Sequence, residues 1–270
     1  MTGKRANRPD PSVATATATP SARPRSGLAT GLRVLETIAA SPEAPSLTQI
    51  AERLGMSKPG IHASIATLLQ RGYVNRDAAG HYVIGLRAWE LGARLPFAAI
   101  AHAASGPMSG LARDFGEGAI LGVLDGWDVV YLQVYESTHP VRVHADPGAR
   151  IPAHCTSTGL ALLSALTPAE VARRRPKNLE AFSPATITSV EGLDAELARI
   201  RRDGFAVNMG GWRADVGGMA TCVRGGHGNT ALAGLCVAAP LYRITPDWLT
   251  QARAALGGTA AEIGRAMDRG

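Results

Sequence analysis

The chain has 270 residues, 46% of them hydrophobic, so it can bury a substantial core and is long enough for two modest domains. No run of 18 apolar residues occurs, which excludes a membrane-spanning helix, and the first residues lack the apolar segment of a signal peptide, so a cytoplasmic protein is expected. The net charge of +6 comes entirely from residues 1–95, which hold 12 Lys and Arg against 6 Asp and Glu, whereas residues 96–270 hold 16 of each sign. This division predicts a small basic domain that binds a polyanion, followed by a neutral domain.

Residues 1–26 are rich in Pro, Ala, Thr and Arg, a composition that predicts a disordered tail. The three cysteines, Cys155, Cys222 and Cys236, fit neither a paired disulfide framework nor a Cys-x-x-Cys zinc pattern. We expect them to be small buried side chains.

Three helices are predicted after the tail. The first covers residues 28–40, and its spacing predicts a core-facing stripe of Leu28, Leu32, Leu35 and Ile38. The second starts at the N-cap Ser46 and ends at Gly55. The third starts at the N-cap Ser57 and directs Ile61, Ile65, Leu68 and Leu69 inward. Two alternating runs, 73–75 and 82–84, then predict a β-hairpin around a turn at 77–80.

The third helix has an unusually small outward face, formed by Pro59, Gly60, Ala63, Thr67 and Gln70, with His62 on its flank. The order of helix, helix, short turn, helix and hairpin is that of a winged helix-turn-helix, in which the last helix enters the major groove of DNA. Small side chains let the helix backbone approach the base edges. A three-helix protein-docking module with a solvated face is the alternative.

Eight residues are the predicted DNA contacts. The backbone N–H groups of the first turn, with Ser57 and Lys58, suit phosphate oxygens, and His62 can donate to a phosphate or a base. The wing adds two cationic or polar side chains. The full set is Ser57, Lys58, Gly60, His62, Ala63, Thr67, Arg76 and His81.

Both halves of the chain resemble a known family. The segments "GLRVLETIAA", "SLTQIAERLGMSKPGIHASIATLLQRGYV" and "GHYVIGLRAWELGARL" in the first part, and "PGARIPAHCTSTGLALLSALTPAE" and "ARIRRDGFAVNMGGWRADVGGMATCV" in the second, are similar to the IclR-type transcriptional regulators over about residues 27–260. The resemblance implies a winged helix-turn-helix domain at 27–87, a linker helix at 88–106 broken at Pro96, and a GAF-like α/β effector-binding domain at 107–270. It also implies a homodimer or a dimer of dimers, double-stranded operator DNA and a small effector as partners, and neither a cofactor nor a membrane.

The second domain is predicted to be α+β from its own pattern. Strands are expected at 119–124, 129–134, 139–144 and 231–238, helices at 157–166, 193–202 and 246–267, and a hairpin turn at 224–230. Because strands and helices mix without a regular βαβ alternation, an antiparallel sheet with helices is expected.

The resemblance also implies an effector site, whose lining carries over to Cys155, Ser157, Thr158, Asn208, Gly218, Cys236 and Ala238. Backbone N–H groups at the helix start near Ser157 suit a carboxylate; the alternative is that Ser157 only caps the helix. The site is less polar than the family usually has, since Gly210, Gly211 and Leu160 replace charged residues and Cys236 and Ala238 replace serines. A larger and more apolar ligand is expected, such as an aromatic acid or a lactone, on which Trp212 could stack unless it belongs to the core.

The helix that reads DNA departs from the family as well. Ala63 replaces a usual arginine and Gly60 a usual threonine, so operator choice should depend on Lys58, His62, Thr67 and the wing, with Ala63 against a thymine methyl group.

Enzymatic readings have little support. His154 and Cys155 are adjacent, and in an extended segment they would point to opposite faces, which does not suit a catalytic pair. The spacing of His139, His144, His154 and Cys155 matches no usual zinc pattern. We expect a ligand-responsive transcriptional regulator, a repressor rather than an activator, and not an enzyme; a small-molecule hydrolase or thiol enzyme fused to a docking module is the alternative.

Overall fold

The computed structural model describes residues 26–225 and 230–269. The predicted tail lies outside the described residues except for Ser26, which is the N-cap of the first helix. Contacts divide the chain into two units between Ala98 and Ala99. No helix within the described ranges is long and apolar enough to cross a membrane.

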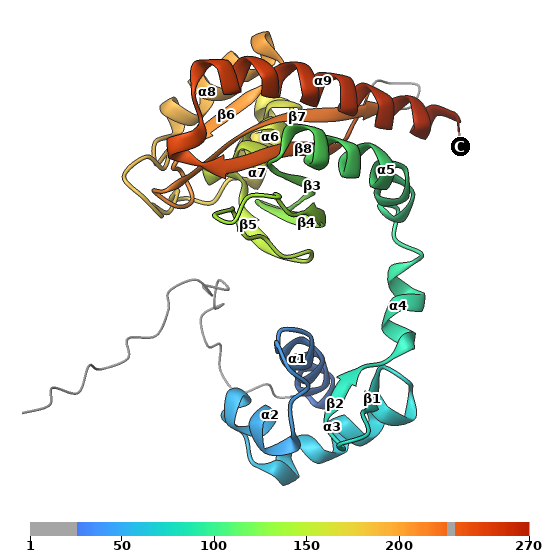
Figure 1. Ribbon diagram of the computed structural model, residues 1–270. Coiled ribbons are helices and arrows are strands. Elements are labelled where there is room, and N and C mark those ends of the chain that lie inside the picture. Colours follow the sequence, from blue (N-terminus) through green and yellow to red (C-terminus); the bar gives the residue numbers. More distant parts are fainter. Residues whose placement is uncertain (1–25, 226–229, 270) are drawn as a thin grey trace, which may run out of the picture. The chain divides into compact units, whose positions relative to one another are not determined.

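The first unit confirms the predicted order of helices and hairpin (Figure 1). Its elements are α1 (Gly27–Ala39), α2 (Leu47–Leu54), α3 (Lys58–Gln70), β1 (Val74–Arg76) and β2 (Tyr82–Ile84). The two strands pair antiparallel, with Arg76 opposite Tyr82. The unit is a winged helix-turn-helix.

Local sequence signals set the boundaries of α2 and α3. Ser46 and Gln49 form a capping box at the start of α2, and Gly55 ends the helix in the left-handed conformation with φ of 62°. Ser57 then caps α3, with Pro59 in its first turn. The turn between α2 and α3 is therefore set locally, by the glycine that ends α2 and the serine that caps α3.

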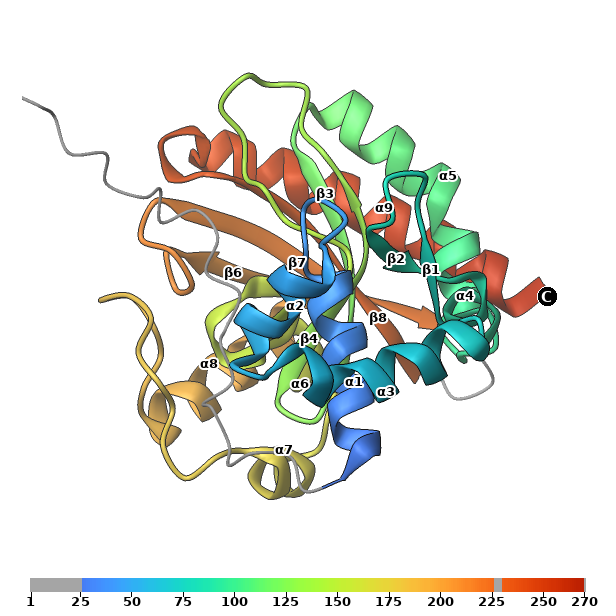
Figure 2. The same cartoon turned by 90° about the horizontal axis from the view of Figure 1, so that it is seen from below.

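The predicted inward face of α1 is correct at Leu35 and Ile38, which pack in or against the core, and wrong at Leu28 and Leu32. The residues that α1 buries are Thr30, Val34 and Ile38, whereas Leu28 is 74% and Leu32 50% exposed. Helix α1 packs across α3, as Figure 2 shows, and both faces of α1 carry apolar residues at helical spacing. Periodicity could therefore not choose between the faces; packing against Ile50, Ile61 and Ile65 did.

The linker is broken around Pro96, as expected. Helix α4 (Leu86–Gly92) ends before it and α5 (Ala98–Phe115) begins after it. Helix α5 continues past the predicted domain boundary at 106/107, and it buries Ile100 as well as Met108. The second unit therefore begins earlier than predicted, because the whole of α5 belongs to its packing.

The second unit is built on a six-stranded antiparallel sheet in the order β5-β4-β3-β8-β7-β6. The strands are β3 (Gly118–Asp125), β4 (Asp128–Tyr135), β5 (Arg150–Pro152), β6 (Ala206–Met209), β7 (Val216–Gly225) and β8 (Thr230–Pro240). The helices are η1 (Ala153–Cys155), α6 (Ser157–Ser164), α7 (Pro168–Arg174), α8 (Val190–Asp203), η2 (Leu241–Arg243) and α9 (Pro246–Arg269). The antiparallel α+β prediction is confirmed.

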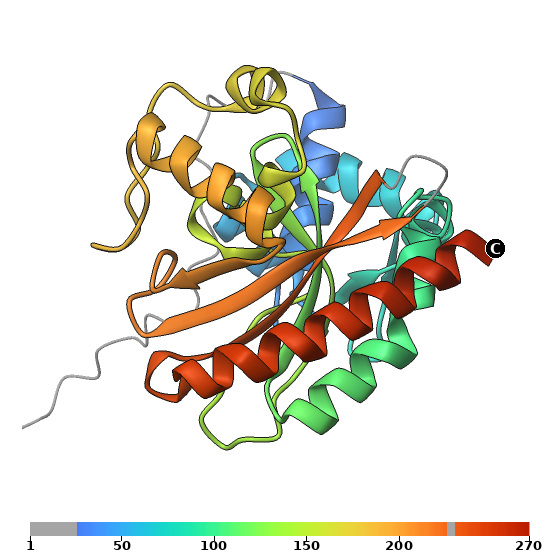
Figure 3. The ribbon, with the colours of Figure 1, turned by 90° about the horizontal axis from the view of Figure 1, so that it is seen from above.

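Helices cover both faces of this sheet (Figure 3). Helices α5 and α9 lie side by side on one face and together line a shallow groove. Helix α6 lies against the other face, where Thr158 and Leu162 approach Gly234, and α8 packs on α6. All eight residues of α6 are buried. The start of α6 therefore meets the sheet inside the unit.

Two predictions for this unit need correction or fall outside the structure. No strand forms at 139–144, because Pro140 has no N–H for a ladder and the free edge of β4 pairs with β5 instead. The long strand β7 was not predicted. The predicted turn at 224–230 lies mostly outside the described residues, although the flanking strands pair antiparallel with Gly225 opposite Thr230.

Candidate DNA-binding surface and effector site

The start of α3 is open to solvent. Ser57 Oγ accepts a hydrogen bond from the Gly60 backbone N–H at 3.2 Å, and every residue from Ser57 to Gly60 is exposed. The N-terminal backbone N–H groups and the Lys58 ammonium therefore lie on the surface. This combination can bind a phosphate group.

The outward face of α3 is exposed along the helix. His62, Ala63 and Thr67 are exposed as predicted, and so are Ala66 and Gln70, which the predicted contact set left out. The helical angle of about 100° per residue places both among the outward residues. An exposed helix face of at least three turns is available to a major groove.

The two predicted wing residues are exposed or half-buried, but both have intramolecular partners. Arg76 donates to the Tyr82 hydroxyl at 3.0 Å, and its guanidinium carbon lies 5.2 Å from the ring centroid. His81 Nδ1 lies 3.8 Å from an Asp77 carboxylate oxygen. Asp77 also accepts the backbone N–H groups of Ala79 and His81 and so fixes the turn. The wing therefore presents Arg76 on a rigid hairpin.

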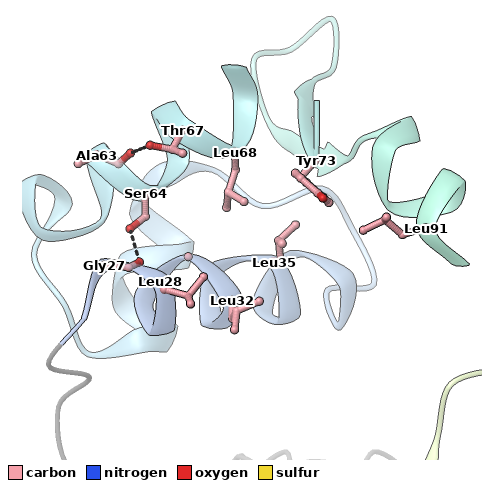
Figure 4. A pocket seen from close by; sticks show the side chains of 11 residues that line it. Gly27, Leu28, Leu32, Leu35, Ala63, Ser64, Thr67, Leu68, Tyr73 and Leu91 are labelled. Carbon is pink, nitrogen blue, oxygen red and sulfur yellow. Dashed lines mark hydrogen bonds between the residues drawn. The ribbon is translucent and has the colours of Figure 1, made fainter. Parts of the chain in front are cut away.

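An apolar groove of about 510 Å³ runs between α1 and α3 (Figure 4). The Ser64 hydroxyl closes one end by donating to the Gly27 carbonyl at 3.4 Å. The sequence pattern gave no indication of the groove, because helical spacing placed Leu28 and Leu32 in the core. The lining residues are Gly27, Leu28, Gly31, Leu32, Leu35, Ala63, Ser64, Thr67, Leu68, Tyr73 and Leu91.

Helix α4 extends this apolar surface. None of its residues is buried. Leu86 is 67%, Trp89 68% and Leu91 50% exposed, and Leu95 just after the helix is 56% exposed. We call Leu28, Leu32 and these four residues the apolar face of the first unit. Side chains of this kind seldom gather on a surface that stays in water.

The predicted effector residues meet where α6 begins above the sheet. The strand register places Asn208, Gly218 and Ala238 opposite one another on β6, β7 and β8, so they lie in one row. Ser157 Oγ lies 3.3 Å from Cys236 Sγ, and a Cβ atom on Gly218 would come within 3.3 Å of each of these atoms. Thus tertiary packing brings residues from three separate stretches of sequence together.

Two of the predicted residues turn their polar atoms elsewhere. The Asn208 side-chain oxygen accepts the Gly211 backbone N–H at 2.8 Å and so holds the loop after β6. The Cys155 thiol points back and donates to the Pro152 carbonyl at 3.0 Å. Cys155 therefore reaches this site through its backbone carbonyl, which lies beside Gly211.

A line of aromatic rings borders the site. The ring centroids of Trp127 and His154 are 6.1 Å apart, those of His154 and Phe182 6.1 Å, and those of Phe182 and Trp212 4.6 Å. Ser183 and Thr186 hold the segment that contains Phe182 against the loop after β6, because their hydroxyls donate to the carbonyls of Gly210 and Gly211. Phe182 gave no signal in the sequence, because only this packing brings it to Trp212.

His154 and Cys155 do not form a catalytic pair. They lie in the 3₁₀ turn η1, not in the extended segment that was expected. Trp127 Nε1 donates to His154 Nδ1 at 3.2 Å, so the proton is on Nε2, which donates to the Glu180 carbonyl at 2.9 Å. Both ring nitrogens are therefore occupied by structural bonds, and none is left to accept a proton from a thiol.

Burial also suppresses the reactivity of the thiols. It raises the pKa of Cys155 well above its usual value and raises the pKa of Cys222 to about 11. Burial likewise raises the pKa of Cys236, an effect that hydrogen bonds from Ser157 and Thr158 oppose. Since the thiolate is the nucleophile, the raised pKa values disfavour reaction of these thiols near neutral pH.

The four residues considered for a metal site are dispersed. His144 lies on the surface between Glu136 and Asp146, and His154 is buried in η1. Within residues 26–225 and 230–269, no group of three or more His, Cys, Asp or Glu side chains could hold a metal ion.

The winged helix-turn-helix with an exposed third helix, joined to an antiparallel sheet domain in which the predicted effector residues meet beside α6, is typical of a class of protein: the ligand-responsive DNA-binding transcriptional regulators. The family models agree. The IclR helix-turn-helix domain matches residues 27–78, and the bacterial transcriptional regulator IclR C-terminal domain matches residues 93–265. The chain belongs to the IclR family.

Individual relatives span nearly the whole chain. The transcriptional repressor IclR of Escherichia coli is 29% identical over 94% of this chain and 93% of its own length. The probable transcriptional regulator SauR of Cupriavidus necator is 34% identical over 80% of this chain and 87% of its own. Among solved structures, an IclR homologue from Microbacterium hydrocarbonoxydans, complexed with 4-hydroxybenzoate, has a TM-score of 0.77 and 26% identity and covers 89% of this chain and 98% of its own.

Proposed function

We propose that the protein is a cytoplasmic repressor that binds a two-fold symmetric operator as a dimer or a dimer of dimers and releases it when a small aromatic acid binds beside α6. The exposed outward face of α3, with the open N-terminus at Ser57, carries this proposal. An exposed recognition helix that follows a fixed turn is the part of a winged helix that enters the major groove.

The proposed contacts divide by chemistry. Ser57, Lys58 and the first-turn N–H groups bind phosphate, and Arg76 on the rigid wing reaches the backbone beside it. His62 on the flank of the outward face hydrogen-bonds to base edges, and Thr67 on that face contacts them through its methyl group. Phosphate contacts set affinity and its salt dependence, whereas base contacts set sequence preference.

The apolar face of the first unit supports the proposed dimer. Leu28, Leu32 and Leu91 line one groove together with Tyr73, and Leu86 and Trp89 on the same helix as Leu91 are exposed as well. A second copy that brings the same leucines would remove them from water on both sides at once, because a two-fold interface uses one surface twice. A dimer also presents two recognition helices to the two halves of a symmetric operator.

The effector class follows from the polarity of the site. Its lining offers the Ser157 hydroxyl and backbone N–H groups at the α6 start for a carboxylate, but otherwise the thiol of Cys236, Ala238 and glycines. Phe182 and Trp212 supply aromatic surface at its border. A ligand with one acidic group and an apolar ring matches this lining, and the structural neighbour complexed with 4-hydroxybenzoate supports that class.

We also propose that the protein binds its effector without converting it. The engaged nitrogens of His154 and the raised thiol pKa of Cys155 support this. At pH 8, a thiol reagent such as dithionitrobenzoate is expected to leave all three cysteines of the native protein unmodified and to react with them after unfolding. Rapid modification of native Cys155 would favour the thiol-enzyme alternative instead.

The first test is fluorescence anisotropy of the full chain with DNA from upstream of its own gene and with scrambled DNA, over a range of salt. A preference of about a thousandfold or more is expected for a specific regulator. Lys58→Ala should weaken binding to both DNAs and reduce the salt slope by about one unit, and His62→Ala should change the preference between sequences. Equal, weak binding of both DNAs by the wild type would contradict operator recognition.

The effector proposal is tested on the same complex. Addition of 4-hydroxybenzoate or benzoate is expected to lower operator affinity at least tenfold, whereas pyruvate, a small polar keto acid, should have little effect. Turnover is followed by chromatography of the added acid, which should be recovered unchanged. Release by pyruvate alone would show that the site is more polar than its lining indicates.

Sedimentation of a Leu28→Glu, Leu32→Glu double variant tests the dimer. The variant should dissociate at least tenfold more readily than the wild type, because carboxylates replace apolar contacts. Val141→Glu is the control, since Val141 is 60% exposed and lies in the second unit. If both proteins sediment like the wild type, the apolar face is not the interface.

A further inference from the structure

The hydroxyl groups of α3 already have partners within the chain. Ser57 Oγ accepts the Gly60 N–H at 3.2 Å, Ser64 Oγ donates to the Gly27 carbonyl, and Thr67 Oγ1 donates to the Ala63 carbonyl at 2.9 Å. To donate to a base, the Ser64 or Thr67 hydroxyl would first have to break a bond that the folded chain makes, whereas the Ser57 hydroxyl keeps its hydrogen but lies at the N-cap, where we propose phosphate binding. The Ser64 and Thr67 hydroxyls are therefore poor donors to base edges.

What remains at the centre of the outward face is hydrocarbon. With about 100° per residue, Pro59, Ala63, Thr67 and Gln70 project most directly away from the buried Ile61 and Ile65, and Ala66 lies beside them. All five are exposed. Of these, only Thr67 and Gln70 carry hydrogen-bonding side chains. The Thr67 hydroxyl donates to the Ala63 carbonyl, and Gln70 lies in the last turn, whereas base contacts of a recognition helix come chiefly from its N-terminal residues.

The major groove offers one hydrocarbon group to such a surface. Guanine and adenine present N7 with O6 or N6, cytosine presents N4, and thymine presents O4 and its 5-methyl group. A 5-methyl group also marks 5-methylcytosine. The methyl side chains of Ala63 and Ala66 can make an apolar contact with this 5-methyl group, which is the one hydrocarbon group on the major-groove edges of the bases.

We propose that α3 selects its operator through the 5-methyl groups of thymines in the major groove, with Ala63 and Ala66 as the residues that contact them. The inference rests on the proposed binding of operator DNA by α3. His62 on the flank and Lys58 at the start then supply hydrogen bonds around a central apolar contact. The specificity of the centre comes from burial of methyl groups, not from a bidentate polar contact.

The test uses a duplex that the full-length protein selects from a random library. Each thymine of the selected site is replaced by deoxyuridine, which removes only the methyl group and keeps the base pair. Affinity is expected to fall about three- to fourfold at one or two thymines in each half-site, the effect of one methyl group left in water. Replacing the same thymine by cytosine should weaken binding, and 5-methylcytosine at that position should recover part of the loss.

Ala63→Gly and Ala66→Gly identify the protein side of the contact. In the variant that lacks the contacting methyl group, the deoxyuridine penalty at the matching thymine should disappear, while the penalties elsewhere persist. Ala39→Gly, an exposed position at the end of α1, is the matched control for the loss of helix propensity and should keep every penalty. The deoxyuridine scan of the wild type stands even if a glycine variant is unstable.

The outcomes separate the two proposals. A selected consensus whose affinity is unchanged by deoxyuridine at every thymine would overturn methyl reading and leave operator binding intact. Deoxyuridine penalties that persist in both glycine variants would also overturn it, because other residues would then make the contact. Failure to select any consensus would instead overturn operator recognition by α3.

Discussion

Helices α3 and α6 are capped in the same way at their N-termini, but the start of α3 is exposed and the start of α6 is buried. In α3 the Ser57 hydroxyl accepts the N–H of Gly60, and in α6 the Thr156 hydroxyl accepts the N–H of Gly159 at 3.0 Å. The first start is exposed, whereas Thr156 and every residue of α6 are buried. The same local signal thus serves a surface that we propose binds a large duplex and a site that we propose encloses a small molecule.

The largest expected difference in stability between the two helix starts comes from substituting alanine for Gly159 in α6 and for Gly60 in α3. A Cβ atom on Gly159 would lie 2.2 Å from the Ala153 carbonyl oxygen, whereas on Gly60 its nearest neighbour is Ser57 Oγ at 3.1 Å. Gly159→Ala should lower the free energy of unfolding by about 3 kcal/mol, the upper end of the usual cost of overpacking. Gly60→Ala should be neutral or stabilise by up to about 1 kcal/mol.

Urea unfolding of both variants measures these changes. Operator affinity of Gly60→Ala is the accompanying functional readout, since this glycine lies on the exposed start of α3. Equal destabilisation by the two substitutions would mean that the starts of α3 and α6 do not differ in packing as described.

Removal of the two caps should give a smaller difference. Thr156→Ala leaves the Gly159 N–H buried without its acceptor and should cost about 2 kcal/mol. Ser57→Ala exposes the Gly60 N–H to water and should cost about 1 kcal/mol or less. Urea unfolding measures the loss of stability in both variants. Thr156→Ser, which keeps the hydroxyl, is the control and should recover most of the loss seen in Thr156→Ala.

The smallest expected effect concerns the capping boxes of the two units. Ser46 pairs with the neutral Gln49 in α2, whereas Thr167 pairs with Glu170 in α7. Hydrogen bonds from the Thr167 backbone and hydroxyl lower the pKa of Glu170 below its usual value of 4.5. Because the folded pKa is lowered, the stabilisation is present above pH 4.5 and is lost as the pH falls through the folded pKa.

Amide hydrogen exchange of Thr167 and Ser46 between pH 6 and pH 3, corrected for intrinsic rates, measures this difference. Protection of Thr167 should decline with acid while that of Ser46 stays constant. Glu170→Gln should make the α7 box as insensitive to pH as the α2 box. A parallel decline at both positions would point to general acid unfolding.

Elements with complete local signals were predictable from sequence. Helices α2 and α3 carry a hydroxyl cap, an apolar stripe and, for α2, a closing glycine, and the wing carries its turn residues between alternating strands. The order of these elements identified the winged helix. Residues 139–144 show the limit, since their alternation resembled a strand, yet they join no sheet, and Pro140 among them lacks the N–H that a ladder uses.

The candidate sites divide in the same way. The exposed face of α3 followed from helical spacing, because the turns of one helix fix which residues share a side. The meeting of Ser157 with Cys236 and of Phe182 with Trp212 depends on strand order and on a loop held by Ser183. The family resemblance assigned Ser157 and Cys236 to one site, but no property of the local sequence could assign Phe182.

By itself, the sequence determined where helices begin and end, which face of α3 turns outward and where the positive charge lies, because these depend on neighbours along the chain. Only the tertiary structure decided that Leu28 and Leu32 face outward while Thr30 and Val34 are buried, and that one capped helix start is open while the other is enclosed. Burial depends on which distant segments pack against a face, and two apolar faces of one helix compete for the same core. Packing settles that competition, and sequence periodicity does not.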